Sequence, residues 1–184
     1  MVILASASPR RHQLLKQVVE DFLIVPTDID EDALTTDDPI QTAETLAFEK
    51  ANAVPKTYEN PVIIGCDTVV ALDGRQYAKP RDRADAIRIL QTLRGRTHQV
   101  ITGVAVLAPH QSVVSHCVTH VSFNDVSDQE IENYVDTGEP MDKAGAYGAQ
   151  GMGSFLVKSL DGPFDNVVGL PLDLTRELLN QVRA

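Results

Sequence analysis

The sequence has few cysteines, and this shortage narrows the class of protein. Among 184 residues only Cys66 and Cys117 are cysteine, and both lie inside apolar runs. We therefore expect two buried free thiols, as in a protein of the cytoplasm, and no disulfide. No CxxC spacing occurs, so a metal site built from cysteine and histidine is not expected.

Long apolar segments are also missing. No run of 18 apolar residues is present, and this excludes a membrane-spanning helix. The first residues do not show a charged stretch followed by an apolar stretch, so no secretory signal peptide is expected. We therefore predict a cytoplasmic protein without a membrane partner.

Positive charge is scarce. The chain has 16 Lys and Arg against 26 Asp and Glu, a formal net charge of −10. This balance argues against binding to a nucleic-acid polymer, which requires a basic face. Most of the acidic residues between positions 17 and 49 are expected to form a solvated loop. Single lysines next to acidic residues, such as Lys50 and Lys79, suit a small polyanion bound with a divalent cation.

Strand and helix patterns alternate along the chain and predict one α/β domain, residues 1–184, with a mixed, twisted sheet and flanking helices. Asp73-Gly74 predicts a hairpin turn. We expect a break at residues 65–68 within the surrounding strand. An acidic loop is expected at residues 27–38. We expect strands at 2–5, 22–25, 62–72, 100–107 and 113–123, and helices at 9–19, 39–54, 82–93, 127–135 and from 171 onward.

The segment LASASPRR at residues 4–11 predicts an anion site. Ser8 can cap a helix that begins at Pro9, where the missing N–H costs nothing. Free backbone N–H groups and the cations of Arg10 and Arg11 then lie at one helix N-terminus, where a phosphate binds readily. An ordinary capped helix with exposed arginines would give the same pattern.

Asp67 is a single carboxylate in the apolar run VIIGCDTVV. Burying such a group is costly unless it is paired or binds a metal. Because catalytic groups in α/β proteins often follow strands, Asp67 is a candidate metal ligand or general base. The alternative is an aspartate that caps a turn at a strand break.

Three further groups of residues are weaker candidates. Glu31, Lys50 and Lys79 would each, alone, more often be surface residues, although Pro80 would hold Lys79 in a fixed direction. The Gly-rich segment 142–151 lets the backbone approach a ligand closely, and Gln150 there offers a donor and an acceptor to a nucleobase. The alternative is that this segment is only a Gly-rich connector. Residues 166–172 are interpreted as structural.

Taken together, these segments resemble the Maf family of nucleoside triphosphate pyrophosphatases. The resemblance covers nearly the whole chain and rests on six ordered motifs: LASASPRR (4–11), GCDTVV (65–70), AKPRD (78–82), TGV (102–104), DKAGAYGAQG (142–151) and NVVGLPL (166–172). It implies an α/β fold with two lobes around a deep cleft, related to the inosine triphosphatase group. It also implies hydrolysis of a nucleotide between its α- and β-phosphates.

The resemblance also implies roles for individual residues. Asp67 matches the family's proton acceptor, and a divalent cation, Mg²⁺ or Mn²⁺, would be held by Asp67 and Glu31. The residues that match phosphate-binding positions are Ser8, Arg11, Lys50 and Lys79.

Two branches of the family differ at three positions. The branch acting on dTTP and UTP is similar to this chain at Arg10, Thr68 and Gln150, whereas the branch acting on 7-methyl-GTP usually has an aromatic residue, Gln and Glu there. We therefore expect hydrolysis of dTTP and UTP. A 7-methyl-GTP pyrophosphatase and a nucleotide-binding regulator of septum formation are the alternatives, and a homodimer is left open.

Overall fold

A single mixed sheet organises the molecule. The structure is a computed structural model of the chain and describes residues 1–183. Its sheet has seven strands in the order β2-β1-β3-β5-β6-β7, with β4 paired to β3. The strands are β1 (Val2–Leu4), β2 (Leu23–Ile24), β3 (Val62–Leu72), β4 (Arg75–Tyr77), β5 (Thr97–Leu107), β6 (Ser112–Phe123) and β7 (Val157–Asp161).

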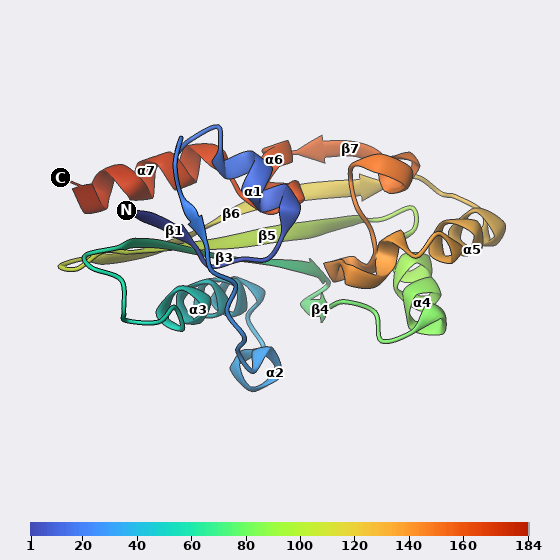
Figure 1. Cartoon of the computed structure of the whole chain (residues 1–184). Helices are drawn as coiled ribbons and strands as arrows, with labels where there is room; N and C mark the ends of the chain where they lie inside the picture. The colour runs from blue at the N-terminus through green and yellow to red at the C-terminus, as the bar shows by residue number, and fades with distance from the viewer. Residues whose placement is uncertain (184) are drawn as a thin grey trace.

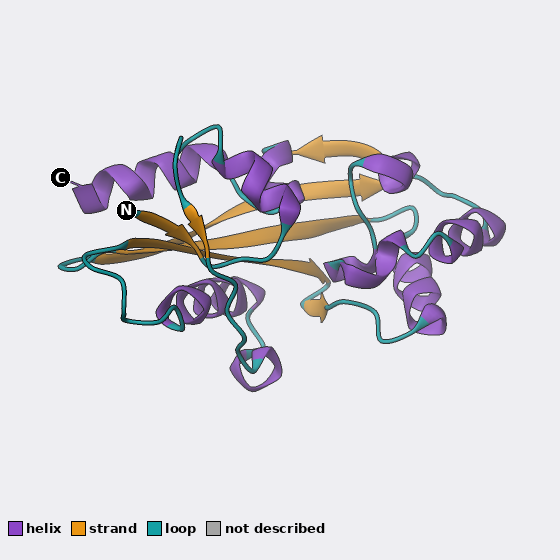
Figure 2. Cartoon of the chain, in the orientation of Figure 1, coloured by secondary structure: helices purple, strands orange, loops and turns teal. Residues whose placement is uncertain are grey.

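Helices cover both faces of the sheet and one of its ends. In Figure 1, α3 lies below the sheet, α1, α6 and α7 lie above it, and α4 and α5 lie at the right-hand end; Figure 2 separates helices from strands by colour. The helices are α1 (Pro9–Leu15), α2 (Glu31–Leu34), α3 (Pro39–Asn52), α4 (Arg83–Leu93), α5 (Asp128–Asp136), α6 (Phe164–Val168) and α7 (Leu172–Arg183), with 3-10 helices η1 (Glu139–Asp142), η2 (Ala144–Ala146) and η3 (Gly151–Leu156). This arrangement confirms the predicted α/β fold with a mixed sheet.

Two hydrophobic cores share one face of the sheet. Near the chain termini, Ile64 and Cys66 of β3 pack in a cluster with residues of α1 and α7. Further along the same strand, Val70 and Leu72 pack in a second cluster with residues of α4 and α5. Side chains of β3 alternate between faces, so these even-numbered residues point to the same side. The sheet therefore runs through two lobes, with residues 67–69 of β3 between them.

One edge of β3 is unpaired at its centre. The short parallel strand β1 pairs with Val62, Ile63 and Ile64, and ends there. The antiparallel strand β4 pairs only with Val70 and the two residues after it. Residues 65–69 therefore have no strand partner on this edge, although β5 pairs with them on the other edge. This gap opens the middle of the sheet to a ligand.

Helix α3 lies unusually close to the other face of the sheet. A Cβ atom at Gly65 would lie 2.1 Å from the carbonyl oxygen of Ala47, and one at Gly103 would lie 2.2 Å from that of Ala43. Only glycine allows backbones to approach in this way. The two glycines on neighbouring strands therefore hold α3 against the sheet.

Several local predictions differ from the structure. The predicted break at residues 65–68 is wrong, because β3 continues through it. The predicted helix at 9–19 ends at Leu15, and α2 lies inside the predicted acidic loop. Cys66 is buried as expected, whereas Cys117 is only partly buried; both thiols are free. The sequence patterns did not indicate β7 or α6.

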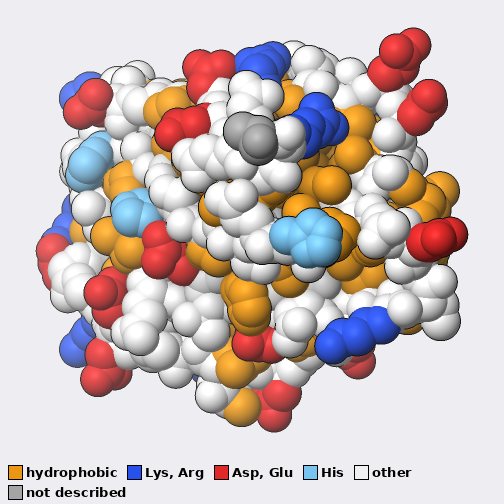
Figure 3. All heavy atoms as spheres, turned by 90° about the vertical axis from the view of Figure 1, so that its left-hand side faces the viewer, with side chains coloured by type: hydrophobic (Ala, Val, Ile, Leu, Met, Phe, Trp, Pro, Cys, Tyr) orange, Lys and Arg blue, Asp and Glu red, His pale blue; other side chains and the backbone are white. Residues whose placement is uncertain are grey.

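Charged side chains are scattered over the surface at one end of the molecule (Figure 3). Figure 3, which faces the left-hand side of Figure 1, shows acidic side chains dispersed over this face rather than gathered in one patch. Within residues 1–183, every helix is too short or too polar to cross a membrane.

Candidate active site

A cavity of about 840 Å³ lies at the unpaired edge of β3. The loop after β1 lines it with residues 5–11, and β3 with residues 67–70. The segment from β4 onward contributes residues 76–79, and the second lobe contributes 142–144. The cavity therefore lies where the two lobes meet, as the expected cleft does.

Asp67 lies in this cavity and forms an ion pair with Lys50. Lys50 Nζ lies 2.5 Å from Asp67 Oδ1 and 2.8 Å from Glu31 Oε1. The side chains of Asp67 and Lys50 are 12% and 14% exposed, and that of Glu31 is 46% exposed. The last turn of α3 brings Lys50 to Asp67, and Thr27 Oγ1, in the loop after β2, donates to the Lys50 carbonyl at 2.9 Å. Asp67 and two of the weaker candidates, Glu31 and Lys50, thus form one charged cluster.

Burial and charge act in opposite directions on these groups. Burial raises the pKa of the Asp67 carboxyl, although the charges of Lys50 and Arg11 oppose the rise. Burial alone would lower the pKa of Lys50, but the two carboxylates raise it overall. For Glu31, burial is outweighed by Lys50, and the pKa is lowered. The cluster therefore keeps Lys50 protonated and gives Asp67 a higher affinity for a proton than an exposed aspartate has.

Arg11 is held from three sides. Its Nε donates to the Gly169 carbonyl at 2.8 Å, Nη2 to Thr68 Oγ1 at 3.0 Å, and Nη1 to Ser6 Oγ at 3.4 Å. A guanidinium has five N–H groups, so two remain without a partner among the described residues. A fixed guanidinium with two free N–H groups matches two oxygens of a phosphate.

A chain of hydroxyl groups supports Arg11 from inside the protein. Thr102 Oγ1 donates to the Asn166 carbonyl at 2.9 Å. The hydrogen bond of 2.9 Å between Thr68 and Thr102 is therefore donated by Thr68, which accepts from Arg11. Asn166 is fully buried, and its Nδ2 donates to the Val100 carbonyl at 3.0 Å. Sequence reasoning gave Thr102 no role and Asn166 only a structural one, although both lie in the quoted motifs.

The loop before α1 is shaped by its own side chains. Ser8 Oγ accepts from the Arg11 N–H at 3.4 Å, which confirms Ser8 as the helix cap. The Ser8 N–H donates to Ser6 Oγ at 3.2 Å, and His12 Nε2 donates to the Ser6 carbonyl at 2.8 Å. Because α1 has only seven residues, the arginine side chains supply the fixed charge here. Sequence reasoning did not identify Ser6 or His12.

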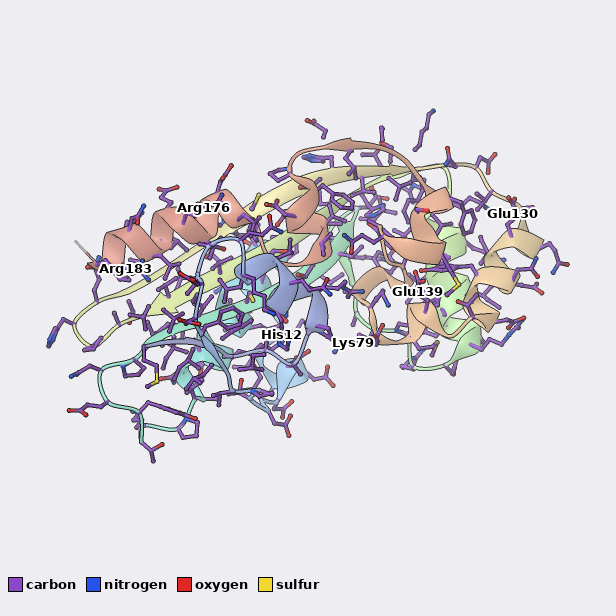
Figure 4. All side chains as sticks on the ribbon, turned by 45° about the horizontal axis from the view of Figure 1, so that its top comes forward. His12, Lys79, Glu130, Glu139, Arg176 and Arg183 are labelled. Atoms are coloured by element: carbon purple, nitrogen blue, oxygen red, sulfur yellow. The ribbon has the colours of Figure 1, made fainter. Side chains whose placement is uncertain are left out.

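Two further cations, Lys79 and Arg10, line the cavity from different sides. Lys79 is exposed and has no carboxylate within 4 Å among residues 1–183. Figure 4 shows Lys79 beside the cavity region, between His12 and Glu139 in that view. Arg10 lies near the second lobe, since Lys143 and then Arg10 hold the pKa of Asp142 below its usual value.

The three residues matched to substrate specificity do not all lie in the cavity. Arg10 and Thr68 line it. Gln150 is exposed and is not among the lining residues, whereas its neighbour Ala149 is. The Gly-rich segment therefore reaches the cavity, with Gln150 at its margin.

The donor set at Asp67 fits a divalent cation that is shared with a substrate. Two carboxylates already converge on one cationic group, and carboxylate oxygens suit Mg²⁺ and Mn²⁺. In the described part of the chain no group of three His, Cys, Asp or Glu residues could hold a metal. A cation at Asp67 and Glu31 would therefore take its other ligands from phosphate and water, as Mg²⁺ commonly does.

A histidine pair with four-residue spacing does not change this conclusion. His116 and His120 both lie on β6, where residues four apart are separated by about 13 Å. His116 Nδ1 donates to Glu44 Oε1 at 2.7 Å, and His120 Nε2 accepts from Gln99 at 3.4 Å. The sequence prediction overlooked this HxxxH spacing, and the separation of the two histidines in the strand prevents a shared metal.

Comparisons with known proteins show the family of the chain. A family model described as Maf-like protein matches residues 1–182. The chain belongs to this family. Of the motifs quoted above, LASASPRR contributes residues 5–11 to the cavity lining, GCDTVV residues 67–70, and AKPRD residues 78–79.

Curated Maf relatives match over nearly their whole length. A dTTP/UTP pyrophosphatase of Symbiobacterium thermophilum is 47% identical over 180 residues, covering 98% of this chain and 93% of that protein. A dTTP/UTP pyrophosphatase of Dictyoglomus turgidum is 48% identical over 183 residues, covering 98% and 95%. Among solved structures, the Staphylococcus aureus Ham1 protein aligns with a TM-score of 0.48 at 18% identity, covering 67% of this chain and 72% of that one.

Proposed function

We propose that this Maf family member hydrolyses dTTP and UTP to the nucleoside monophosphate and pyrophosphate. The observation that carries the proposal is the buried Asp67, paired with Lys50 in a cavity that Arg11 and Lys79 also line. The names of the relatives at 47% and 48% identity support the substrate class. The single domain and the cytoplasmic location remain part of the proposal, and the two free thiols support the latter.

The cations would bind and orient the triphosphate. Catalysis of phosphoryl transfer depends mainly on positioning and on neutralising charge. Arg11 would donate its two free N–H groups to phosphate oxygens, and the exposed ammonium of Lys79 would contribute a second contact. Ser8 and the backbone of its loop would complete the phosphate-binding surface.

Asp67 would act as the general base. Its carboxylate would accept a proton from the water that attacks the α-phosphorus, and Lys50 would hold it in place and keep it ionised. A general base contributes roughly 10²–10⁴-fold to a rate. The raised pKa of Asp67 suits this role, because a base accepts a proton more readily when its pKa is closer to the working pH.

Asp67 and Glu31 would hold a Mg²⁺ or Mn²⁺ ion with the substrate. Such an ion, when bound, polarises the phosphate and lowers the pKa of water. The protein's own part is to supply two carboxylates that Lys50 already draws together.

Arg10, Thr68 and Gln150 would select the base. The uracil edge presents an acceptor, a donor and an acceptor, and cytosine reverses this pattern at two positions. A site that hydrogen-bonds one pattern rejects the other because its buried groups are left unpaired, at about 1–3 kcal/mol per group. The methyl group of thymine needs only space, so dTTP and UTP should be similar substrates.

A substrate panel with product analysis tests the proposal. We expect kcat/KM to be highest for dTTP and UTP, and lower for CTP and 7-methyl-GTP. In ¹⁸O-water the label should enter the monophosphate, because water attacks the α-phosphorus. A preference for 7-methyl-GTP would assign the sister activity, and nucleotide binding without turnover would point to a regulator; label in pyrophosphate would contradict the mechanism.

A further inference from the structure

The carboxylate of Glu139 fastens the loop of residues 148–153. Glu139 Oε2 accepts from the Met152 N–H at 3.2 Å, and Oε1 accepts from the Gly153 N–H at 3.1 Å. These two hydrogen bonds are made by the Glu139 side chain. They do not belong to the backbone hydrogen bonds of η1, which begins at Glu139, or of η3. A side chain 13 residues away in sequence therefore holds the end of this loop.

Tyr134 holds the start of the same loop. Its hydroxyl donates to Glu139 Oε1 at 2.9 Å and accepts from the Gly148 N–H at 3.0 Å. Tyr134 is 3% exposed, and burial raises the pKa of its hydroxyl, so the group keeps its proton. We call Tyr134, Glu139 and the three backbone N–H groups they bind the Glu139 anchor.

The loop is shaped to close around this anchor. A Cβ atom at Gly153 would lie 2.4 Å from the Gly148 carbonyl oxygen and 2.5 Å from the Tyr134 hydroxyl. The backbone of the loop thus folds back on itself against Tyr134, and no other residue type would fit at Gly153.

The anchored loop borders the cavity. Ala149 lines the cavity, and Gln150 follows it, between the two fastened ends. The Glu139 main chain is tied to the same wall, because Lys143 Nζ donates to its carbonyl at 2.7 Å and Lys143 also lines the cavity. In Figure 4, Glu139 lies between Lys79 and Glu130, and Glu130 lies at the right-hand end of the molecule.

We propose that Glu139 and Tyr134 are positioning residues that set the geometry of the base-recognition loop. Neither residue lines the cavity, and both act through the backbone at 148–153. This inference rests on the proposed function, because it assigns the base to this wall of the cavity. Loosening the anchor should weaken the choice between uracil and cytosine while the hydrolytic machinery around Asp67 stays intact.

Two variants test the anchor. Glu139→Gln keeps the size of the side chain. Its amide, however, has a single acceptor oxygen for the Tyr134 hydroxyl and the two backbone N–H groups, and its NH₂ group faces donors instead of accepting from them. Tyr134→Phe removes the hydroxyl and keeps the ring, which packs edge-to-face with Phe155. The control is Glu130→Gln, an exposed capping-box residue that glutamine replaces without losing the cap.

The readout is the ratio of kcat/KM for UTP to that for CTP, with Tm measured for each variant. For Glu139→Gln and Tyr134→Phe we expect this ratio to fall about tenfold, mainly through a higher KM for UTP, because small misplacements at a recognition site are costly. Glu130→Gln should keep the wild-type ratio.

The outcomes separate this inference from the proposed function. Wild-type rates alone decide whether UTP is preferred. If UTP is preferred and both variants keep the wild-type ratio, the anchor does not set selectivity; an equal loss for both nucleotides would show a merely structural role and overturn the inference too. If Glu139→Gln does not fold, Tyr134→Phe decides.

Discussion

At the scale of single residues, Asp67 is a buried carboxylate whose burial would be unfavourable in free energy without its cationic partner. It is a carboxylate with 8% of its surface exposed, in a strand that is otherwise apolar. Lys50 offsets the buried charge at 2.5 Å, and Glu31 shares the same ammonium. A buried charge is tolerated only with such partners, and groups with shifted pKa values in a cavity are typical of catalytic sites.

The first prediction concerns Asp67→Asn. Asparagine keeps the shape of the side chain but can neither accept a proton nor bind a cation as well. We expect kcat for UTP to fall at least about 100-fold, the usual loss when a general base is removed. The control is Asp73→Asn, at an exposed turn position beyond the end of the same strand. A variant that folds and keeps more than about a tenth of the wild-type kcat would show that Asp67 is not the base.

The second prediction concerns the pH dependence of Asp67. Burial raises the pKa of its carboxyl above the usual 3.8, so activity should be lost on the acid side at a higher pH than an exposed aspartate would allow. Lys50 opposes this rise. In Lys50→Met the acid limb of the kcat/KM profile should therefore move to still higher pH, in addition to any loss of rate.

The control for the pH profile is Lys158→Met, which removes an exposed lysine on β7. It should leave the acid limb where the wild type has it. An acid limb that stays in place, or moves to lower pH, in Lys50→Met would contradict the assignment of that limb to Asp67.

At the scale of elements, the contact between α3 and the sheet positions Lys50. Gly65 and Gly103 lie on neighbouring strands, and both leave room for the α3 backbone. Gly103 is also the partner of Asp67 in the β3–β5 pairing, so the helix crosses directly under Asp67. The distance between Lys50 and Asp67 thus depends on the two glycines, Gly65 and Gly103, which let α3 approach the sheet.

The third prediction is that Gly103→Ala disturbs both stability and catalysis. The added Cβ would meet the Ala43 carbonyl at 2.2 Å, so α3 must move away from the sheet. We expect a loss of roughly 1–3 kcal/mol in the free energy of unfolding, the usual cost of overpacking. Because Lys50 moves with the helix, kcat should fall as well.

Gly74→Ala is the matched control for this substitution. A Cβ at Gly74 meets nothing within 4 Å, so only its positive φ is strained. Thermal unfolding and UTP hydrolysis of both variants give the comparison. A Gly103→Ala protein with wild-type kcat would show that α3 can shift without displacing Lys50.

At the scale of the whole molecule, one sheet joins two lobes and leaves the cavity between them. The first lobe supplies Arg11 and Lys50, β3 carries Asp67 between the lobes, and the second lobe supplies the wall around Lys143 and Ala149. A nucleotide in this cavity would contact both lobes. Ligand binding should therefore stabilise the entire fold, since only the folded state brings these segments together.

The fourth prediction is a thermal shift with a UTP analogue whose α–β bridge cannot be hydrolysed. At 100 times its Kd, in the presence of Mg²⁺, it should raise Tm by roughly 5–10 °C. Chelating the cation should reduce the shift, because Asp67 and Glu31 would then face the phosphates without it. Arg11→Ala should also bind more weakly, and an undiminished shift in that variant would remove Arg11 from the phosphate site.

Local features of the fold follow from the sequence by itself. Ser8 and Pro9 begin α1, Asp73-Gly74 forms the turn between β3 and β4, and the Ser127–Glu130 capping box begins α5. Each depends on residues at most three positions apart, whose backbone preferences act without help from the rest of the chain. The motifs likewise include several of the segments that line the cavity, although the lining residues of α2 and α3 lie outside them.

Only the tertiary structure decided how distant groups meet. Lys50 and Asp67 are 17 positions apart, and Arg11 and Gly169 are 158 apart. Their contacts depend on sheet register and on the close approach of α3, which no local pattern specifies. The same packing explains why the break predicted at residues 65–68 is absent. Gly65 makes room for helix α3 and does not form a turn. The Glu139 anchor was missed for this reason too: a glutamate that binds backbone N–H groups 13 and 14 residues away has no local signature.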